Sequence, residues 1–192
     1  GPHDMALALV GATYANGYVK NKVMEFVGPG VASLSADCRN GIDCMTTETT
    51  CWSSIWQTDG VTEEYLAGHG RADAYKELKP ADVAYYDGCI ELDLSKIECM
   101  IALPMHPSYA YPIRELKANA KDLLHEIETR ANEQLSGKVK MDLVSKVRAD
   151  GSIYVDQGIV AGCSGGTYEN LCAVADILRG KSCGNGEFKF SA

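Results

Sequence analysis

The sequence predicts an α/β fold built from two layered α/β/α units, which we place at residues 1–113 and 114–192. Short apolar runs alternate along the chain with segments of helical periodicity, a pattern typical of layered α/β proteins. Three prolines, at positions 104, 107 and 112, interrupt regular structure between the two units. The clearest helical pattern of the chain follows directly after this break, which supports a boundary there.

The first unit is expected to open with a buried helix and a strand. Residues 4–15 are apolar nearly all round, which indicates a helix enclosed by other elements. Residues 23–27 have the pattern of a strand, and a Gly-Pro-Gly sequence ends it. Ser35 is a suitable N-cap for a second helix, which we expect to continue towards Trp56 although its threonines lower the helix propensity.

The remainder of the first unit is expected to hold two short helices and a second strand. The helices are predicted at residues 62–67 and 71–77, on either side of a Gly-His-Gly sequence. Ile90 and Leu92 alternate with acidic residues, so residues 84–94 are predicted to form a strand with one face towards water.

The second unit is expected to contain a long helix, a strand and a final helix. Apolar residues recur at helical spacing over residues 116–135. A strand is predicted from 153 to 161, with a buried end at 157–161, and it leads into a glycine-rich turn around Cys163. Thr167 then opens an amphipathic helix.

Composition excludes several classes of protein. The 46% apolar composition is sufficient for a packed core without disulfides. Eight cysteines and no recognisable secretory leader predict reduced thiols in a cytoplasmic protein. The net charge of −8 disfavours nucleic-acid binding, which depends on clustered Lys and Arg. No apolar run approaches the roughly 18 residues of a membrane helix, so no membrane partner is expected.

Cys163 is the first candidate functional residue, because it lies where a strand ends and a helix begins. The N–H groups and positive dipole of a following helix favour the thiolate form, which binds metals and attacks electrophiles. The alternative is a small turn residue with a structural role only.

Five segments of the chain occur in an order that is characteristic of one known family. Around Cys163, a Gly-Cys-Ser turn precedes a helix that begins near Tyr-Glu-Asn. The other four segments are Pro2-His3-Asp4, Glu25-Phe26-Val27-Gly28-Pro29-Gly30-Val31, Asp43-Cys44-Met45-Thr46-Thr47-Glu48 and Tyr86-Asp87-Gly88-Cys89-Ile90-Glu91-Leu92-Asp93-Leu94-Ser95. In these segments the sequence resembles the aconitase family of iron–sulfur hydro-lyases. Residues 21–26 and 46–51 look more like an uncharacterised hydratase branch than like aconitase or isopropylmalate isomerase.

The resemblance implies a fold, a cofactor and an activity. The chain looks like a fragment comprising the second domain and the start of the third, within a lyase that adds or removes water on a small hydroxy acid. Cys163 would be one cysteine ligand of a [4Fe–4S] cluster. Glu48, one helical turn after Cys44, would be a catalytic residue that acts on the hydroxyl bound to the open iron. Remaining aconitase-like domains would supply the base and the substrate-binding arginine, so the fragment alone is expected to be inactive and to lack the cluster.

The sequence also departs from the family pattern. Members hold the cluster with three cysteines, two of them in a Cys-x-x-Cys segment, and no such segment occurs here. Cys44 stands where aconitase and isopropylmalate isomerase have asparagine, and a thiol does not reproduce the donor and acceptor of an amide. Without the resemblance, Glu48 would be an exposed helix residue.

Two other functions remain open. One is a non-catalytic regulatory or scaffold domain of a degenerate aconitase-like protein. The other is a cysteine hydrolase using Cys163, for which no histidine partner lies nearby in sequence.

Overall fold

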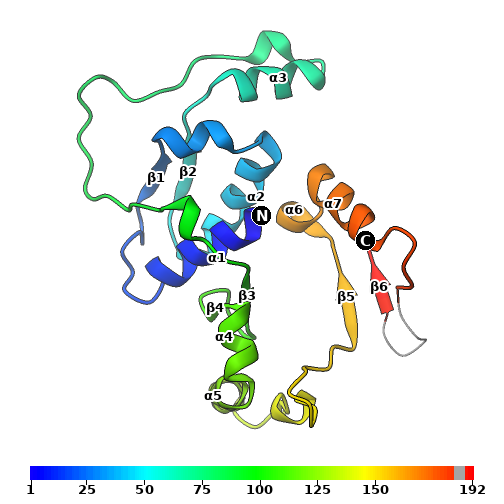
Figure 1. The fold of residues 1–192 in the computed structure, drawn as a ribbon. Coiled ribbons are helices and arrows are strands. Elements are labelled where there is room, and N and C mark those ends of the chain that lie inside the picture. Colours follow the sequence, from blue (N-terminus) through cyan, green and yellow to red (C-terminus); the bar gives the residue numbers. More distant parts are fainter. Residues whose placement is uncertain (184–188) are drawn as a thin grey trace. The chain divides into compact units, whose positions relative to one another are not determined.

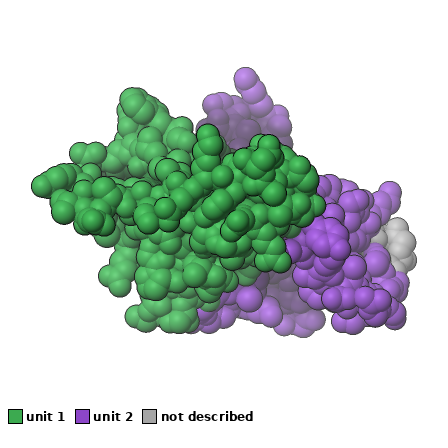
Figure 2. Space-filling model, turned by 90° about the horizontal axis from the view of Figure 1, so that it is seen from above, with its two compact units in different colours: residues 1–97 green, residues 98–192 purple. Residues whose placement is uncertain are grey.

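The computed structural model describes residues 1–183 and 189–192 and consists of helices and small two-stranded sheets, so the predicted α/β class is confirmed (Figure 1). The chain divides into two compact units, Gly1–Ile97 and Glu98–Ala192, which Figure 2 colours separately. This division lies before the proline-rich segment and not at 113/114, because strand β3 (Met100–Ala102) pairs antiparallel with β4 (Ala110–Pro112). The prolines therefore belong to a hairpin within the second unit.

The first helix of unit 1, α1 (Pro2–Thr13), is buried as predicted. Most of its apolar side chains lie in the core of the unit, and Val10 has no exposed surface. Leu9 packs with Val19 and Met24, so the helix covers strand β1 (Val23–Phe26). One side of the helix is therefore buried within unit 1, while Gly11 and Ala12 remain exposed.

Strand β1 pairs in parallel with β2 (Ser53–Trp56), and helix α2 (Ala36–Thr46) connects the two. Ser35 caps α2, its side chain accepting a hydrogen bond from the backbone N–H of Cys38 at 3.1 Å. A single helix reaching Trp56 is wrong, because α2 ends at Thr46 and a 3₁₀ turn, η2 (Thr47–Thr49), follows it.

The physical reason for this early end lies in the threonines. The hydroxyls of Thr46 and Thr47 donate to the carbonyl oxygens of Asp43 and Cys44, at 2.7 and 3.0 Å, and such bonds compete with helix continuation. Thr50 then adopts a left-handed conformation with φ of 65°, which stops the helical path. The chain is thereby turned into β2.

Helix α3 (Gly60–Gly68) and two 3₁₀ turns, η1 (Pro29–Ser33) and η3 (Ala72–Ala74), complete the regular structure before residue 75. The predicted strand at 84–94 is wrong: these described residues form no β-ladder and end in the 3₁₀ turn η4 (Leu94–Lys96). Side chains hold this segment instead. An alternating pattern forms a strand only where another strand lies beside it. Within the described structure, no strand pairs with residues 84–94.

Unit 2 has its core between the β3–β4 hairpin and two consecutive helices, α4 (Ile113–Ala118) and α5 (Ala120–Gln134). The core consists of Leu103, Leu116, Leu124 and Ile127. The predicted continuous helix over 116–135 is divided at Asn119, which leaves helical geometry with φ of −129° and ψ of 32°.

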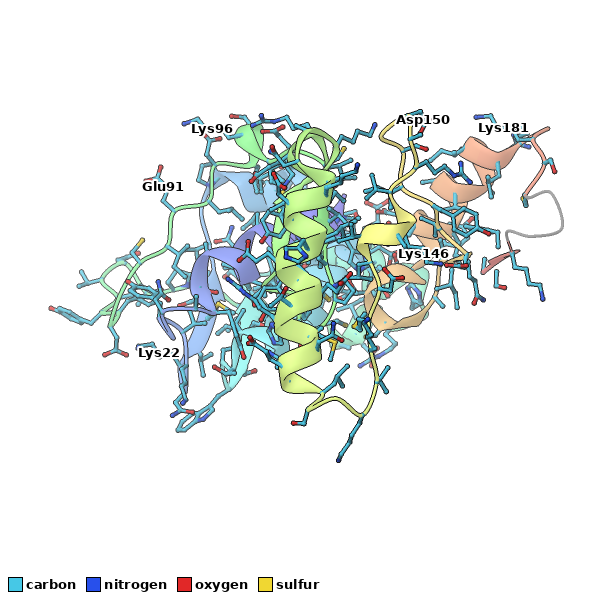
Figure 3. The ribbon with its side chains drawn as sticks, turned by 90° about the horizontal axis from the view of Figure 1, so that it is seen from below. Lys22, Glu91, Lys96, Lys146, Asp150 and Lys181 are labelled. Atoms are coloured by element: carbon cyan, nitrogen blue, oxygen red, sulfur yellow. The ribbon has the colours of Figure 1, made fainter. Side chains whose placement is uncertain are left out.

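Beyond α5, a 3₁₀ turn η5 (Val144–Lys146) ends at Lys146, which donates to Asp156 at 2.8 Å and is labelled in Figure 3. The unit closes with β5 (Gln157–Ile159), the short helix α6 (Gly162–Gly165), α7 (Tyr168–Leu178) and β6 (Lys189–Ser191).

Strands β5 and β6 pair in parallel, and α7 lies between them in the sequence. The expectation of a buried strand at 157–161 is wrong, because Ile159 is 66% exposed. Within the described part of the chain, α7 contributes no buried residue either. The final α/β element of unit 2 therefore exposes several large apolar side chains, namely Ile159, Tyr168, Leu171 and Ile177.

No helix among residues 1–183 and 189–192 has both the length and the apolar character needed to cross a bilayer.

Candidate functional site

Glu48 lies half-buried in the 3₁₀ turn η2, between helix α2 and strand β2. Cys44 is also half-buried and occupies the last turn of α2. The two residues do not share one continuous α-helix as expected, because η2 begins at Thr47. The carboxylate is thus carried by a short turn whose position depends on the residues around it.

Buried hydroxyl groups surround this turn. Thr46 and Thr49, on either side of Thr47 and Glu48, are 2% and 0% exposed. The Thr49 hydroxyl donates to the carbonyl oxygen of Thr46 at 2.6 Å, and the Cys51 thiol donates to the same oxygen at 3.3 Å. The backbone next to Glu48 is therefore held by one fully buried side chain, Thr49, and one half-buried side chain, Cys51.

Asp43 links the end of α2 to strand β2. Its carboxylate accepts hydrogen bonds from the Ser54 hydroxyl and, at 3.3 Å, from the indole N–H of Trp56. The Trp56 ring is itself stacked on Phe26 of β1, with ring centroids 4.1 Å apart. The helix end, both strands and the stacked rings therefore form one locally connected group.

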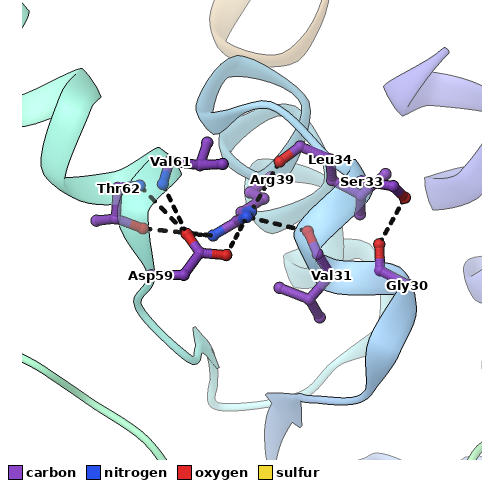
Figure 4. A network of polar contacts seen from close by, with 8 residues as sticks. All are labelled: Gly30, Val31, Ser33, Leu34, Arg39, Asp59, Val61 and Thr62. Atoms are coloured by element: carbon purple, nitrogen blue, oxygen red, sulfur yellow. Dashed lines mark hydrogen bonds and ion pairs between the residues drawn. The ribbon is translucent and has the colours of Figure 1, made fainter.

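A second polar cluster, centred on Arg39, holds α2 against the start of α3 (Figure 4). The guanidinium group is 4% exposed and donates to both carboxylate oxygens of Asp59, at 2.9 and 2.8 Å. It also donates to the carbonyl oxygens of Val31 and Leu34, at 2.9 and 3.1 Å. Asp59 in turn caps α3 by accepting from the backbone N–H groups of Val61 and Thr62.

The hydrogen bonds from Arg39 hold the pKa of Asp59 below its ordinary value, and the bonds from the α3 backbone act in the same direction against the effect of burial. Both charges are therefore compensated within unit 1.

Cys163 lies in α6, a single helical turn between β5 and α7, and its side chain is exposed. The sequence predicts a glycine-rich turn at Cys163, and the structure corrects this to one turn of helix, while the strand before it and the helix after it are present. Gly162 has φ of 83°, and a Cβ at Gly166 would lie 2.9 Å from the carbonyl oxygen of Gly162. Glycine is required at both positions because the backbone folds back on itself there.

The residue after Cys163 anchors the turn. Ser164 is buried, and its carbonyl oxygen accepts a hydrogen bond from the side chain of Asn170 in α7 at 3.1 Å. The exposed thiol is thus attached to a turn that a side chain of α7 holds in place.

The other cysteines differ from one another in burial. Cys38 is buried and Cys51 is half-buried, whereas Cys89, Cys99 and Cys172 are exposed.

A [4Fe–4S] cluster requires several ligands that converge on one point. Within residues 1–183 and 189–192, no group of three or more His, Cys, Asp or Glu side chains is placed to hold a metal ion. The described residues therefore do not fit such a cluster by themselves. Cys163 has the exposure that a single ligand needs.

Sequence patterns assign no role to Arg39, Asp59, Asp43 or Ser54. A signal was available for one of them: an aspartate followed by a glycine and a short apolar-periodic segment is the pattern of an N-cap, as at Asp59. The contacts of Arg39 and Ser54 join segments that are distant in sequence, so local patterns do not reveal them.

Comparison with known proteins identifies the family. The sequence model of the aconitase family (aconitate hydratase) matches residues 1–191. The chain belongs to the aconitase family.

Its relatives in this family include several dehydratases. The 2,3-dimethylmalate dehydratase large subunit of Eubacterium barkeri is 29% identical over 178 residues, which cover 93% of this chain and 34% of that subunit. The 3-isopropylmalate dehydratase large subunit of Caldicellulosiruptor bescii is 28% identical over 183 residues, covering 95% and 34%. The 3-isopropylmalate dehydratase large subunit 1 of Pyrococcus furiosus is 29% identical over 178 residues, covering 93% and 34%. The chain thus spans about a third of the length of these curated relatives.

Within this aconitase-family chain, Glu48 belongs to unit 1 and Cys163 to unit 2.

Proposed function

We propose that this chain is part of an aconitase-family hydro-lyase, which adds or removes water on a small hydroxy acid. The observation that carries the proposal is the family match over residues 1–191. The relatives are named as dehydratases of 2,3-dimethylmalate and 3-isopropylmalate, which favours a branched hydroxy-dicarboxylic acid as substrate class. Because the chain corresponds to about a third of those subunits, the complete reaction would need the remaining aconitase-like domains.

In this proposal Glu48 is the catalytic group of the chain. A carboxylate on a fixed, half-buried turn is suited to accept a hydrogen bond from a substrate hydroxyl and to take up its proton. The hydroxyl groups around the turn fix the position of the Glu48 carboxylate. Proton transfer over a hydrogen-bond distance requires such a fixed position.

Cys163 would supply one thiolate to a [4Fe–4S] cluster, and the further ligands would come from outside the described residues. Its exposed position on a glycine-dependent turn supports this assignment. A soft thiolate is the ligand type that iron–sulfur clusters use. The eight cysteines, for which we expect reduced thiols, and the net charge of −8 favour a cytoplasmic enzyme that does not bind nucleic acid.

The test compares Cys163→Ser with Cys172→Ser in the whole protein that carries this chain. Serine is a hard and poorly ionised ligand, so Cys163→Ser should abolish cluster content and hydratase activity while the thermal unfolding temperature changes little. Cys172 is also exposed but lies within α7, and its replacement should leave iron and sulfide content nearly intact.

Iron and sulfide would be measured after anaerobic purification, beside activity on branched malates. Equal iron loss in both variants would contradict the assignment of Cys163. A wild-type protein with neither cluster nor activity would favour the regulatory or scaffold alternative.

A further inference from the structure

A chain of side-chain hydrogen bonds joins the last turn of α2 to strand β2, directly beside the turn that carries Glu48. The Thr46 hydroxyl shares its one proton between the carbonyl oxygen of Asp43 and the hydroxyl oxygen of Ser54, each 2.7 Å away. The Ser54 hydroxyl donates its own proton to the Asp43 carboxylate, which additionally accepts from Trp56. Asp43 and Thr46 thus contact strand β2 through one shared partner, Ser54.

The backbone on both sides of Glu48 is held by a further set of bonds. The carbonyl oxygen of Thr46 accepts from Thr49 and Cys51, and the Thr50 N–H donates to the carbonyl oxygen of Thr47 at 3.1 Å. The carbonyl oxygen of Thr50 accepts from the N–H of Asn21, at 3.2 Å, in the segment between α1 and β1. The turn is therefore attached to α2, to the residues before β1 and, through Ser54, to β2.

Burying hydroxyl groups is unfavourable unless each has a partner, and Thr46 and Thr49 are almost completely buried. The Thr49 hydroxyl donates to the carbonyl oxygen of Thr46, two residues before Glu48, and the Thr46 hydroxyl bonds to the last turn of α2. These bonds hold both ends of the turn that carries Glu48, where a displacement of about 1 Å would change the rate of a proton transfer substantially.

We propose that Asp43, Thr46 and Ser54 are positioning residues, which hold the Thr47–Thr49 turn on strand β2 so that the Glu48 carboxylate meets the substrate hydroxyl. The inference rests on the role proposed above for Glu48. It assigns to these three side chains no contact with substrate and no proton transfer of their own.

The first experiment measures the kinetics of the whole hydro-lyase. Ser54→Ala and Thr46→Val remove one hydroxyl each, and we expect kcat to fall about 10- to 100-fold while KM changes less than about threefold. Thr46→Ser retains the hydroxyl and should restore kcat to within about threefold of the wild type. Thr129→Ala is the matched control, since its exposed hydroxyl donates to the His125 carbonyl oxygen within α5 of unit 2.

The second experiment uses the 192-residue chain and does not depend on activity. Amide hydrogen exchange at residues 47–51 should be faster in Ser54→Ala than in the wild type, while exchange in α1 is unchanged. Ser54 is only partly buried, so this variant serves where Thr46→Val does not fold. Unchanged exchange at 47–51, or a Ser54→Ala enzyme with wild-type kcat, overturns the inference.

Glu48→Gln separates the two proposals. Loss of activity in Glu48→Gln together with full activity in Ser54→Ala rejects the positioning inference alone. Full activity in Glu48→Gln rejects the catalytic role of Glu48, and the positioning inference falls with it.

Discussion

Arg39 shows how a charged side chain is accommodated inside unit 1. Its guanidinium group has donors in a fixed planar arrangement, and each bond recorded for it ends on an oxygen of Asp59, Thr62, Val31 or Leu34. Removing one partner from such a pair leaves a buried charge uncompensated. The resulting loss of stability is larger than the net stabilisation that the intact pair provides. Asp59 is therefore expected to matter more for stability than its position at a helix start suggests.

Replacing Asp59 by alanine should destabilise unit 1 by about 3 kcal/mol, since it leaves the charge of Arg39 buried and removes the cap of α3. Both tryptophans, Trp52 and Trp56, lie in unit 1, so urea unfolding followed by tryptophan fluorescence reports on this unit alone. Glu77→Ala, which removes an exposed partner of Lys79, is the control and should change the midpoint little. A shift of equal size in both variants would contradict this view.

The lowered pKa of Asp59 also predicts a pH dependence. Because the folded pKa lies below the unfolded value, the ion pair contributes its full stability above roughly pH 4 and loses it as the pH falls through the folded pKa. The stability difference between the wild type and Asp59→Ala should therefore be constant from pH 8 to pH 5 and shrink below pH 4. Urea midpoints measured across this range provide the check, and a difference that grows on acidification would disprove the linkage.

Among the elements, helix α5 carries the core of unit 2. Ile127 has no exposed surface and belongs to the core cluster, against which residues of the β3–β4 hairpin and residues around η5 pack. Ile127 lies in the middle of the helix, among closely packed side chains. These neighbours cannot easily move to fill the space that a smaller side chain would leave.

Ile127→Ala should cost about 3–4 kcal/mol in the stability of unit 2, because it removes buried surface and leaves a cavity. Ile177→Ala in α7 is the matched control, since that side chain is exposed and its loss should cost little. Amide exchange in α5 measures the effect directly. Equal protection in the two variants would show that α5 is not the centre of the core.

Elements with strong local signals could be predicted from the sequence, and elements set by distant contacts could not. The apolar periphery of α1 and the Ser35 cap of α2 are local features, and both predictions are confirmed. The end of α2 depends on the contact between the Thr46 and Ser54 hydroxyls. Residues 84–94 form no strand because no strand lies beside them within the described structure. Neither fact is encoded in a short window of sequence.

The same distinction applies to the candidate site. Glu48 and Cys163 could be proposed because the segments that contain them resemble a family. Asp43 and Ser54 lie eleven residues apart, on a helix and a strand, and their contact required the fold. The roles of Glu48 and Cys163 stay predictions until the variants are measured.

On the scale of the whole molecule, the chain holds two compact units and spans about a third of its curated relatives. The described residues provide no convergent set of metal ligands. Cluster assembly on one exposed cysteine would leave the irons open to water and oxygen.

Anaerobic reconstitution of the isolated chain with iron and sulfide should therefore yield no stoichiometric [4Fe–4S] cluster. Optical and Mössbauer spectra after desalting measure the outcome, and the chain should not dehydrate citrate-like acids under the same conditions. A stable cluster bound at one equivalent would show that further cysteines of this chain, such as Cys44, act as ligands.

The open face of the last α/β element has a consequence for how the protein behaves in solution. Ile159 and Tyr168 are 66% and 78% exposed, so copies of the chain could adhere through these side chains. The net charge of −8 makes copies of the chain repel one another, which opposes such adhesion. The range of this repulsion shrinks from about 10 Å in 0.1 M salt to about 3 Å in 1 M salt. Colloidal stability should thus be greatest in dilute, mildly alkaline buffer and should decline as salt is added or as the pH approaches the isoelectric point near 5.0.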